Sequence, residues 1–426
     1  MSGKRVAIIG AGVAGLVSIK SCLEEGLEPV CFKRHDDIGG IWYYTEQLRK
    51  GQAAATYDSV VTNRSKEMSC FSDFPFPKEW PPFLSRLRVH DKPHFPSYPG
   101  LETFDGIKIH CNEYRDSSKV KSKRFLVVGA ASTAGEVACE LAKDDSIQVF
   151  LSMRHGTWVI PRIGVHCIPD DLWFSRSVVD KAKISKQYIK DYKIVGLQPL
   201  EPLNSTSSVM INDDIQHRIM QGKLVSLTGI ERFEANCVTL TDGSTLSDID
   251  AVVFATGYKM AFPFLKNSLV FDKSDNLQLY KLLFPVAVQQ QPDRMVLIGM
   301  FNPDGPIFST IELQARWAVN VFIRRAKLPT EDTMRVDIEE RCKYMRMYHE
   351  LAEELNANPS FWKMCISDPR LAIACWYGPQ TPYTYRLQGS RTWDGAREAI
   401  LSIWENTISP TSSYAIDIVL VVLIRG

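Results

Sequence analysis

VAIIGAGVAG, the sequence of residues 6–15, decides the fold of this chain. Its apolar run 6–9 predicts a short buried strand. Apolar residues then recur at helical spacing from Val13 onward, and Gly26 is typical of the residue that stops a helix. Residues 28–32 predict a second strand. This part of the chain is therefore expected to form one complete β-α-β unit.

Three glycines lie at the turn between the first strand and the helix, with the spacing Gly10-x-Gly12-x-x-Gly15. Gly10 permits a tight turn, Gly12 lets the backbone approach a pyrophosphate, and Gly15 lets the helix pack closely on the strand. The helix N-terminus also supplies free backbone N–H groups for a phosphate. The turn therefore predicts a dinucleotide-binding site, and a bare packing turn is the alternative.

A second β-α-β unit follows. Its strand, helix and strand are predicted at residues 125–128, 133–142 and 147–151. The turn reads GAASTAG at residues 129–135, and Ala131 and Ala134 replace the second and third glycines of the fingerprint. A methyl group at the second position crowds a phosphate, whereas Ala is an accepted third residue. From these residues alone, a second nucleotide site and a purely structural unit both remain open.

A third apolar stretch, residues 249–258, reads IDAVVFATGY and predicts a buried strand that ends in a turn of small residues. Two dinucleotide units and this returning strand indicate an α/β protein with two Rossmann-like domains, of which the first is discontinuous in sequence. Between the two units, residues 75–99 carry seven prolines and are interpreted as a linker.

The composition argues against several classes of protein. Fifty Lys and Arg residues against 49 Asp and Glu leave a net charge of +1 over 426 residues, so no nucleic-acid partner is expected. Ten cysteines without a C-x-x-C pair fit free thiols in a reducing compartment, and not disulfides, a redox pair or a metal site. The N-terminus leads into the first strand without the features of a secretory signal.

Further stretches carry a resemblance to a known family. They are DDIGGIW at 36–42, the segment 63–77 with Lys66-Glu67-Met68, FATGY at 254–258, and the spacing Phe104-x-Gly106-x-x-x-His110-x-x-x-Tyr114. Together with the glycine turn, they make almost the whole chain similar to the flavin-containing monooxygenases of the dimethylaniline N-oxide-forming type. A Baeyer-Villiger enzyme shares the last signature but ends it in Trp, where this chain has Tyr114.

The resemblance implies an enzyme that uses FAD and NADPH. NADPH reduces the flavin, the reduced flavin captures molecular oxygen as a hydroperoxide, and a soft nitrogen or sulfur nucleophile of an amine or sulfide substrate attacks the distal oxygen. The cofactor carries the difficult chemistry, so the protein binds, orients and excludes water. No catalytic triad or metal site is therefore expected, and His110 is expected to organise the domain junction.

The resemblance also assigns residues to each cofactor. Those expected at FAD are Gly10, Ala11, Gly12, Val13, Ala14, Gly15, Lys33, Gly39, Gly40, Ile41, Trp42, Thr62 and Asn63. Those expected at NADP are Gly129, Ser132, Thr133, Ala134, Gly135 and Arg154. Asn63 is the expected catalytic residue, because the family places an asparagine near the reactive flavin edge, where an amide can donate and accept. Arg154 favours NADPH over NADH, since it can pair with a 2′-phosphate.

The expected domain order follows from the same resemblance. It comprises a shortened first part of the FAD domain at 1–100, the NADP domain at 101–250, the FAD-domain return strand with a helical part at 251–405, and a hydrophobic tail at 406–426. The apolar run 416–424 is shorter than the roughly twenty residues of a spanning helix. The tail is expected to give peripheral contact with the cytosolic face of the endoplasmic reticulum membrane, and a cytoplasmic protein is the alternative.

Three features depart from the family pattern. Lys33 stands where the family has a glutamate that accepts the adenosine ribose hydroxyls. Only 27 residues separate Phe76 from Phe104, whereas the family has several tens more, so a piece of the FAD domain is expected to be absent. Ala131 narrows the space for the NADP pyrophosphate. An impaired monooxygenase, a catalytically inactive relative that acts by protein contacts, and an NADPH oxidase that produces hydrogen peroxide are therefore open alternatives.

Overall fold

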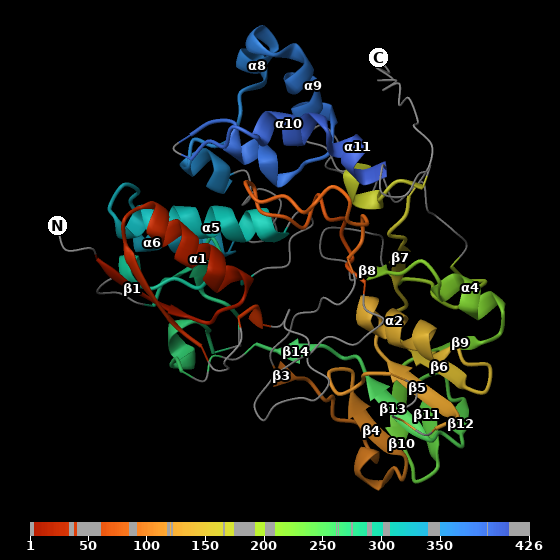
Figure 1. Cartoon of the computed structure of the whole chain (residues 1–426). Helices are drawn as coiled ribbons and strands as arrows, with labels where there is room; N and C mark the ends of the chain where they lie inside the picture. Colours follow the sequence, from red (N-terminus) through yellow and green to blue (C-terminus); the bar gives the residue numbers. More distant parts are fainter. Residues whose placement is uncertain are drawn as a thin grey trace.

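The computed structural model describes residues 4–33, 38–40, 61–84, 92–116, 120, 122–164, 167–173, 192–200, 209–260, 262, 264–273, 276–287, 292–300, 307–339, 350–389 and 391–408. Figure 1 shows three groups of elements: an N-terminal unit that includes α5 and α6, a second unit built around a parallel sheet, and a layer of short helices from the C-terminal part of the chain.

The N-terminal unit has the predicted β-α-β order. β1 (Arg5–Ile9) and β2 (Glu28–Phe32) pair in parallel, and α1 (Val13–Glu24) connects them. α1 ends shortly before Gly26, whose φ of 71° is the left-handed conformation typical of a helix stop. The two strands and the helix predicted from the glycine turn are therefore confirmed.

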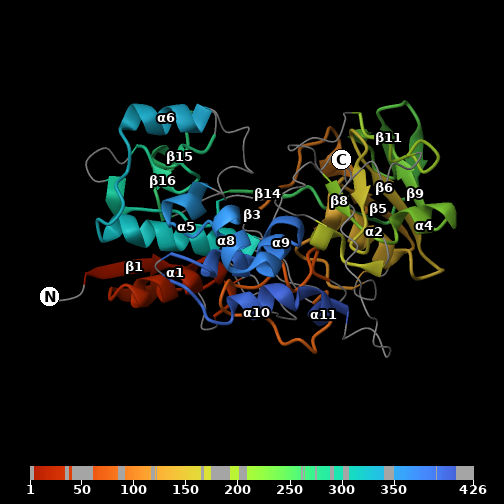
Figure 2. The same ribbon diagram turned by 90° about the horizontal axis from the view of Figure 1, so that it is seen from above.

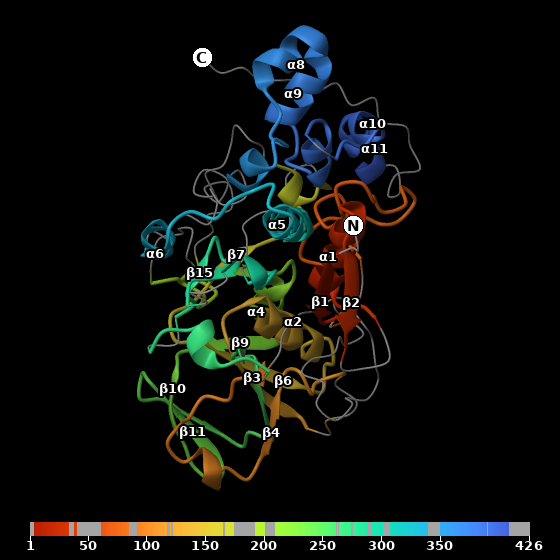
Figure 3. The ribbon, with the colours of Figure 1, turned by 90° about the vertical axis from the view of Figure 1, so that its left-hand side faces the viewer.

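Among the described residues, helices cover only one face of this two-stranded sheet. α1 packs on this face, and α5 (Ile307–Phe322) lies alongside α1 (Figures 2 and 3). Ile9 and Phe32 end the two strands with exposed fractions of 61% and 56%. The expectation of a buried first strand is therefore wrong for Ile9. Parallel strands are buried only where helices cover both faces, and no described strand extends this sheet beyond β1 and β2.

The second unit is built on a parallel sheet in the order β4-β13-β5-β6-β9. Its strands are β4 (Ile107–His110), β5 (Arg124–Val128), β6 (Gln148–Ser152), β9 (Leu224–Leu227) and β13 (Ala251–Phe254). Its helices are α2 (Ser132–Leu141), between β5 and β6, and α4 (Ile215–Met220), before β9. The second β-α-β unit is confirmed, and its buried sheet and helix residues form the largest apolar cluster of the described chain.

The strand predicted within residues 249–258 forms, but in a different sheet from the expected one. β13 lies between β4 and β5 and pairs in parallel with both, so the expectation that it returns to the first domain is wrong. All four residues of β13 are apolar and fully buried, and the centre of a sheet covered on both faces buries such a strand completely. The connection between the units is made afterwards, where β14 (Tyr258–Lys259) pairs with β3 (Lys92–Pro93) (Figure 1).

Smaller elements complete the molecule. In the second unit they are β7 (Trp158–Ile160), which pairs with β8 (Val209–Ile211), and the antiparallel strands β10 (Ile230–Phe233), β11 (Cys237–Leu240) and β12 (Thr245–Ser247). The first unit adds β15 (Leu279–Tyr280), β16 (Phe284–Pro285) and α6 (Glu331–Glu339). The C-terminal layer comprises α8 (Phe361–Ser367), α9 (Pro369–Tyr377), α10 (Ala396–Leu401) and α11 (Ile403–Ile408).

Candidate functional site

The glycine turn lies between β1 and α1, and its three glycines are needed for different reasons. A Cβ on Gly15 would lie 2.0 Å from the Gly10 carbonyl oxygen, so only glycine permits the close packing of α1 on the turn. Gly10 has a φ of 109°, which L side chains rarely adopt. A Cβ on Gly12 would have no neighbouring atom closer than 3.7 Å. The protein therefore leaves space beside Gly12 at a helix N-terminus, which fits a pyrophosphate.

Gly39 and Gly40, two of the residues expected at FAD, lie against this turn. Gly39 donates its backbone N–H to the carbonyl of Ala11 at 2.8 Å. Gly40 has a φ of 61°, and a Cβ on it would lie 2.9 Å from Gly12 Cα. The two backbones therefore touch, and residues far apart in the sequence form one small glycine-lined surface at the N-terminus of α1.

The other residues expected near FAD differ in their surroundings. Val13 and Ala14 form the first turn of α1 and pack toward α5. Lys33 directly follows β2 and is exposed. It occupies the position where an acid would accept ribose hydroxyls, and an ammonium group can only donate. Ile41 and Trp42 lie outside the described residues. The residues therefore fit the pyrophosphate of FAD well and its adenosine ribose poorly.

The turn before α2 resembles the first turn but is narrower. Gly129 has a φ of 150°, and a Cβ on it would lie 2.5 Å from the Ala255 carbonyl oxygen. Ala131 is the N-cap residue of α2, and its methyl group is exposed. That methyl occupies the position at which Gly12 leaves space in the first turn, as the sequence predicted.

Several of the residues expected at NADP hold α2 in place. The Ser132 hydroxyl accepts a hydrogen bond from the Ile211 backbone N–H at 2.9 Å. Ala134 is fully buried, and a Cβ on Gly135 would lie 2.5 Å from the Met210 sulfur. Ala134 and Gly135 therefore allow close packing of α2 on β8 and present no side chain to a ligand.

Thr133 and Arg154 are more accessible. Thr133 is partly exposed in the first turn of α2. Arg154 lies two residues beyond the end of β6, is exposed, and makes no hydrogen bond or ion pair with any described residue. A guanidinium without such a partner, placed after the second strand of a β-α-β unit, suits a 2′-phosphate.

Asn63 lies at the junction of the two units. Its Oδ1 accepts a hydrogen bond from Arg162 Nη2 at 2.9 Å, and the Thr62 carbonyl accepts one from Arg162 Nε at 3.1 Å. Thr62 is in turn paired with Leu84 through bonds of 2.7 and 2.9 Å. The Asn63 side chain is exposed, so its amide is both anchored and accessible.

Arg162 is a site residue that the sequence analysis missed. Its Nη1 pairs with Asp213 Oδ2 at 3.1 Å, its Nη2 pairs with Glu136 of α2, and its side chain is 9% exposed. Glu136, Asp213 and Asn63 lie 26, 51 and 99 residues away in the chain. No local spacing indicates such a cluster, and folding alone brings it together.

A buried ion cluster holds the other end of the segment that begins with Asn63. Glu312 of α5 accepts bonds from the Ser72 backbone N–H at 2.9 Å and from its hydroxyl at 2.6 Å. Arg386, from the short 3₁₀-helix Pro382–Arg386, pairs with Glu312 and, at 3.0 Å, with Asp73. The segment is therefore held at both ends, by Arg162 and by Arg386.

His110 has structural surroundings. Its ring is fully buried, with Nδ1 3.2 Å from Asn112 Oδ1 and Nε2 3.1 Å from the Gly257 carbonyl oxygen. Burial lowers the pKa of the ring. His110 thus links the end of β4 to the turn after β13, two neighbouring strands of the second unit.

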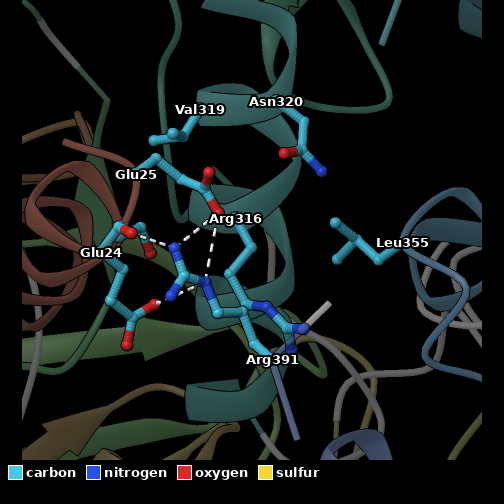
Figure 4. Close-up of a pocket in the computed structure, with 8 residues that line it drawn as sticks. Glu24, Glu25, Arg316, Val319, Asn320, Leu355 and Arg391 are labelled. Carbon is cyan, nitrogen blue, oxygen red and sulfur yellow. Dashed lines mark hydrogen bonds and ion pairs between the residues drawn. The ribbon is translucent and has the colours of Figure 1, made fainter. Parts of the chain in front are cut away.

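A small pocket lies at the opposite end of α1 from the glycine turn. It is lined by residues such as Glu25, Arg316 and Asn320, and its volume of about 10 Å³ suits one water molecule. Arg391 pairs with Glu25 at 2.8 Å and also with Glu24. Figure 4 shows these three residues beside the pocket. This pocket is too small for a nucleotide and is not part of the candidate site.

Within the described ranges, no group of His, Cys, Asp and Glu side chains is arranged to hold a metal ion. None of the helices within those ranges is long and apolar enough to cross a bilayer.

Two glycine-turn units that meet at a polar junction define a class of protein, the oxidoreductases that bind two dinucleotides. Comparison with known families makes this more specific. The flavin-binding monooxygenase-like (FMO-like) family matches residues 3–95 and 89–419. The chain belongs to this family.

Individual relatives agree with this assignment. The chain is 35% identical to dimethylaniline monooxygenase [N-oxide-forming] 2 of Rattus norvegicus, over 96% of this chain and 93% of that protein. It is 33% identical to flavin-containing monooxygenase 2 of Homo sapiens, over 97% and 94%. The solved structure of S-allyl-L-cysteine S-oxygenase from Allium sativum has the same fold, with a TM-score of 0.59, 17% identity and coverage of 96% and 99%.

The same comparisons support the expected internal deletion. The alignment with the rat enzyme extends over 502 positions, whereas the whole chain has 426 residues, so at least 76 positions are gaps in this chain. The two family matches meet at residues 89–95. That point lies between Phe76 and Phe104, in the stretch that the sequence analysis identified as short.

Proposed function

We propose that this chain is an NADPH-dependent flavin monooxygenase that oxygenates soft nitrogen and sulfur nucleophiles, with molecular oxygen and an amine or sulfide as substrates. Family membership supports the reaction class, and several relatives are named as N-oxide-forming enzymes. The structural observation that carries the proposal is the position of the Asn63 amide, which is anchored at the junction of the two nucleotide-binding units.

FAD is assigned to the first unit. The backbone N–H groups at the N-terminus of α1 and the space beside Gly12 would hold its pyrophosphate, with Gly39 and Gly40 closing one side. Lys33 would lie beside the adenosine ribose and offers no acceptor for the ribose hydroxyls. This end of the cofactor is therefore held less tightly than in a unit with an acid at this position.

NADPH is assigned to the second unit. The first turn of α2, from Ala131 to Thr133, would face the pyrophosphate, and Arg154 would pair with the 2′-phosphate. Ala134 and Gly135 contribute by close packing of the helix. This arrangement selects NADPH over NADH through a charge that NADH lacks.

Asn63 is the proposed catalytic residue. Bound FAD, reduced by NADPH, supplies activated oxygen for transfer to the nucleophile. The Asn63 amide would touch the reacting atoms and donate a hydrogen bond to them, since its oxygen is already bound to Arg162. The two units together would keep water from the reacting atoms.

The division into domains remains a proposal. We place the FAD unit at residues 1–100 and again after β14, and a tail at 406–426. We place the NADP unit at 101–257, so that β13 stays in the same unit as the other strands of its sheet.

Membrane contact at the cytosolic face of the endoplasmic reticulum is a further part of the proposal, with a cytoplasmic protein as the alternative. The tail supports it by composition, and its residues 409–426 lie outside the described chain. α8 and α9 project from the body of the molecule (Figure 1) and expose apolar side chains, with Trp362 at 76% and Ile366 at 88%. Flotation with lipid vesicles tests this: loss of binding is expected for the double variant Trp362→Ser, Ile366→Ser.

The experiment that tests the monooxygenase is an assay of the purified chain with FAD and NADPH. A tertiary amine or a thioether is added, and NADPH consumed, hydrogen peroxide and the N-oxide or S-oxide are all measured. We expect the unaltered chain to form oxygenated product and the variant Asn63→Ala to form none. A chain that binds FAD but never oxidises NADPH would contradict the proposal and favour a catalytically inactive relative; NADPH oxidation with peroxide alone would favour an oxidase.

A further inference from the structure

Arg162 makes contacts on both sides of the domain junction. It follows β7 by two residues, and its backbone N–H donates to Asp213 Oδ1 at 2.8 Å. On the side of the second unit its guanidinium pairs with Glu136 and Asp213. On the other side it donates to the Thr62 carbonyl and to Asn63 Oδ1. The position of Arg162 is thus set by the NADP unit, and it holds a segment of the FAD unit.

We propose that Arg162 is a positioning residue that determines which end of the Asn63 amide faces the reaction centre. This inference rests on the proposed function of Asn63. An amide has an accepting oxygen and a donating NH₂ group of nearly equal size, so an asparagine can present either one. A guanidinium only donates. It therefore bonds to the amide oxygen and allows only one of the two orientations of the asparagine. With Oδ1 bound to Arg162 Nη2 at 2.9 Å, Nδ2 is left to donate to the reacting atoms.

The charges around Arg162 argue for this indirect role over direct catalysis. Two carboxylates, Glu136 and Asp213, pair with the single guanidinium, whose side chain is 9% exposed. Its positive charge is thus outweighed by the two carboxylates, and all three of its nitrogens have partners. A guanidinium in that state orients its neighbours and adds little net positive charge for a reacting oxygen.

Glu136 connects Arg162 to the helix at which the nucleotide is assigned. It lies in α2, in the turn that follows Ser132 and Thr133, where the nucleotide is assigned. A nucleotide seated on α2 therefore lies one helical turn from the carboxylate that shares Arg162 Nη2 with Asn63. The assigned NADP position and the Asn63 amide are thus connected through two side chains, Glu136 and Arg162.

The test compares Arg162→Met, Asn63→Ala, Asn63→Asp and the double variant Arg162→Met, Asn63→Ala. In Arg162→Met we expect the ratio of oxygenated product to peroxide to fall about tenfold, while the rate of flavin reduction by NADPH in a single turnover stays within about twofold. The double variant should be no worse than Asn63→Ala, because Arg162 acts through Asn63. Arg232→Met, which removes an exposed arginine paired with Glu234 at 2.9 Å, is the matched control.

Asn63→Asp separates orientation from anchoring. An aspartate keeps an acceptor for Arg162, yet it has no donor, and product should fall as in Asn63→Ala. The contact itself is measured without flavin, by a double-mutant cycle of thermal unfolding on Arg162→Met and Asn63→Ala, where non-additivity is expected.

Two results would overturn the inference: an unchanged product-to-peroxide ratio in Arg162→Met, or full product formation by Asn63→Asp. Additive effects on unfolding would show that the two side chains do not interact. If the unaltered chain forms no oxygenated product, the proposed function fails, and the flavin-free cycle still decides whether Arg162 positions Asn63.

Discussion

Gly12 and Gly15 are three residues apart, yet only Gly15 is required by the packing of the protein itself. Gly15 is needed by the protein itself, because a Cβ there would lie 2.0 Å from the Gly10 carbonyl oxygen. Beside Gly12 the nearest atom to such a Cβ is 3.7 Å away. An alanine therefore fits at residue 12 and occupies the space that a pyrophosphate needs.

This difference predicts opposite results for two alanine variants. Gly12→Ala should keep its thermal midpoint without cofactor, with a change in unfolding free energy within about 0.5 kcal/mol, but bind FAD about tenfold more weakly, or ~1.4 kcal/mol. Gly15→Ala should be destabilised by about 3 kcal/mol, because its Cβ collides with backbone. Thermal unfolding with and without FAD measures both. Equal loss of stability in the two variants would contradict the assignment.

Lys33 gives a second prediction at the scale of one residue. Its ammonium cannot accept a hydrogen bond from a ribose hydroxyl, whereas a charged acceptor contributes on the order of 1.5 to 3 kcal/mol. Lys33→Glu should therefore tighten FAD binding at least about tenfold, measured as a dissociation constant by flavin fluorescence. Lys143→Glu, an exposed lysine after α2, makes the same change of charge elsewhere. An unchanged dissociation constant in Lys33→Glu would place the weakness in the missing segment.

At the scale of elements, the end of β4 is joined to the turn after β13 by His110. Because the buried ring lies between Asn112 Oδ1 and the Gly257 carbonyl, the contact holds two neighbouring strands in register. Tyr258 lies edge-on to the same ring, with centroids 5.0 Å apart. Gly257 and Tyr258 of the FATGY stretch thus both contact the buried ring of His110.

The lowered pKa of His110 predicts a pH dependence of stability. The folded state binds the proton less readily than the unfolded state, whose histidine titrates near its ordinary value of about 6.5. The stabilisation is therefore fully present above about pH 6.5 and is lost as pH falls toward the lower folded pKa. Denaturant unfolding between pH 5 and 8 should show this slope, and His110→Gln should reduce it. The exposed residue His217, changed to Gln, is the control; an unaltered slope in His110→Gln would refute the prediction.

At the scale of the whole molecule, the part of the first unit that the structure describes exposes the ends of its two strands. The strands that end at the cofactor turn finish in Ile9 and Phe32, which are 61% and 56% exposed. At least 76 alignment positions of the rat relative have no counterpart here. Fewer protein groups are therefore available to exclude water from the flavin.

This exposure predicts poor coupling. A closed cavity prevents the loss of activated oxygen to water, so we expect most NADPH oxidation to release hydrogen peroxide, with little N-oxide or S-oxide. Yields of peroxide and product per NADPH, with a small tertiary amine or thioether present, measure this. Product close to one equivalent per NADPH would show that other parts of the chain close the site.

The sequence by itself determined the two β-α-β units, because each depends on short-range patterns: apolar periodicity, and glycines at the spacing of a phosphate-binding turn. Gly10 to Gly15 and residues 129–135 therefore form the predicted turns. Family motifs likewise pointed to the short stretch before Phe104 and made Asn63 a candidate residue. These features lie within a few tens of residues, where local sterics and hydrogen bonding dominate.

Only the tertiary structure decided how distant segments meet. β13 joins the second sheet and not the first, and its apolar side chains are completely buried between β4 and β5. Arg162 reaches Asn63 across 99 residues, and Arg386 reaches Glu312 across 74. Such contacts depend on the relative placement of whole elements, which no local pattern encodes, and they hold the segment that carries the candidate catalytic amide.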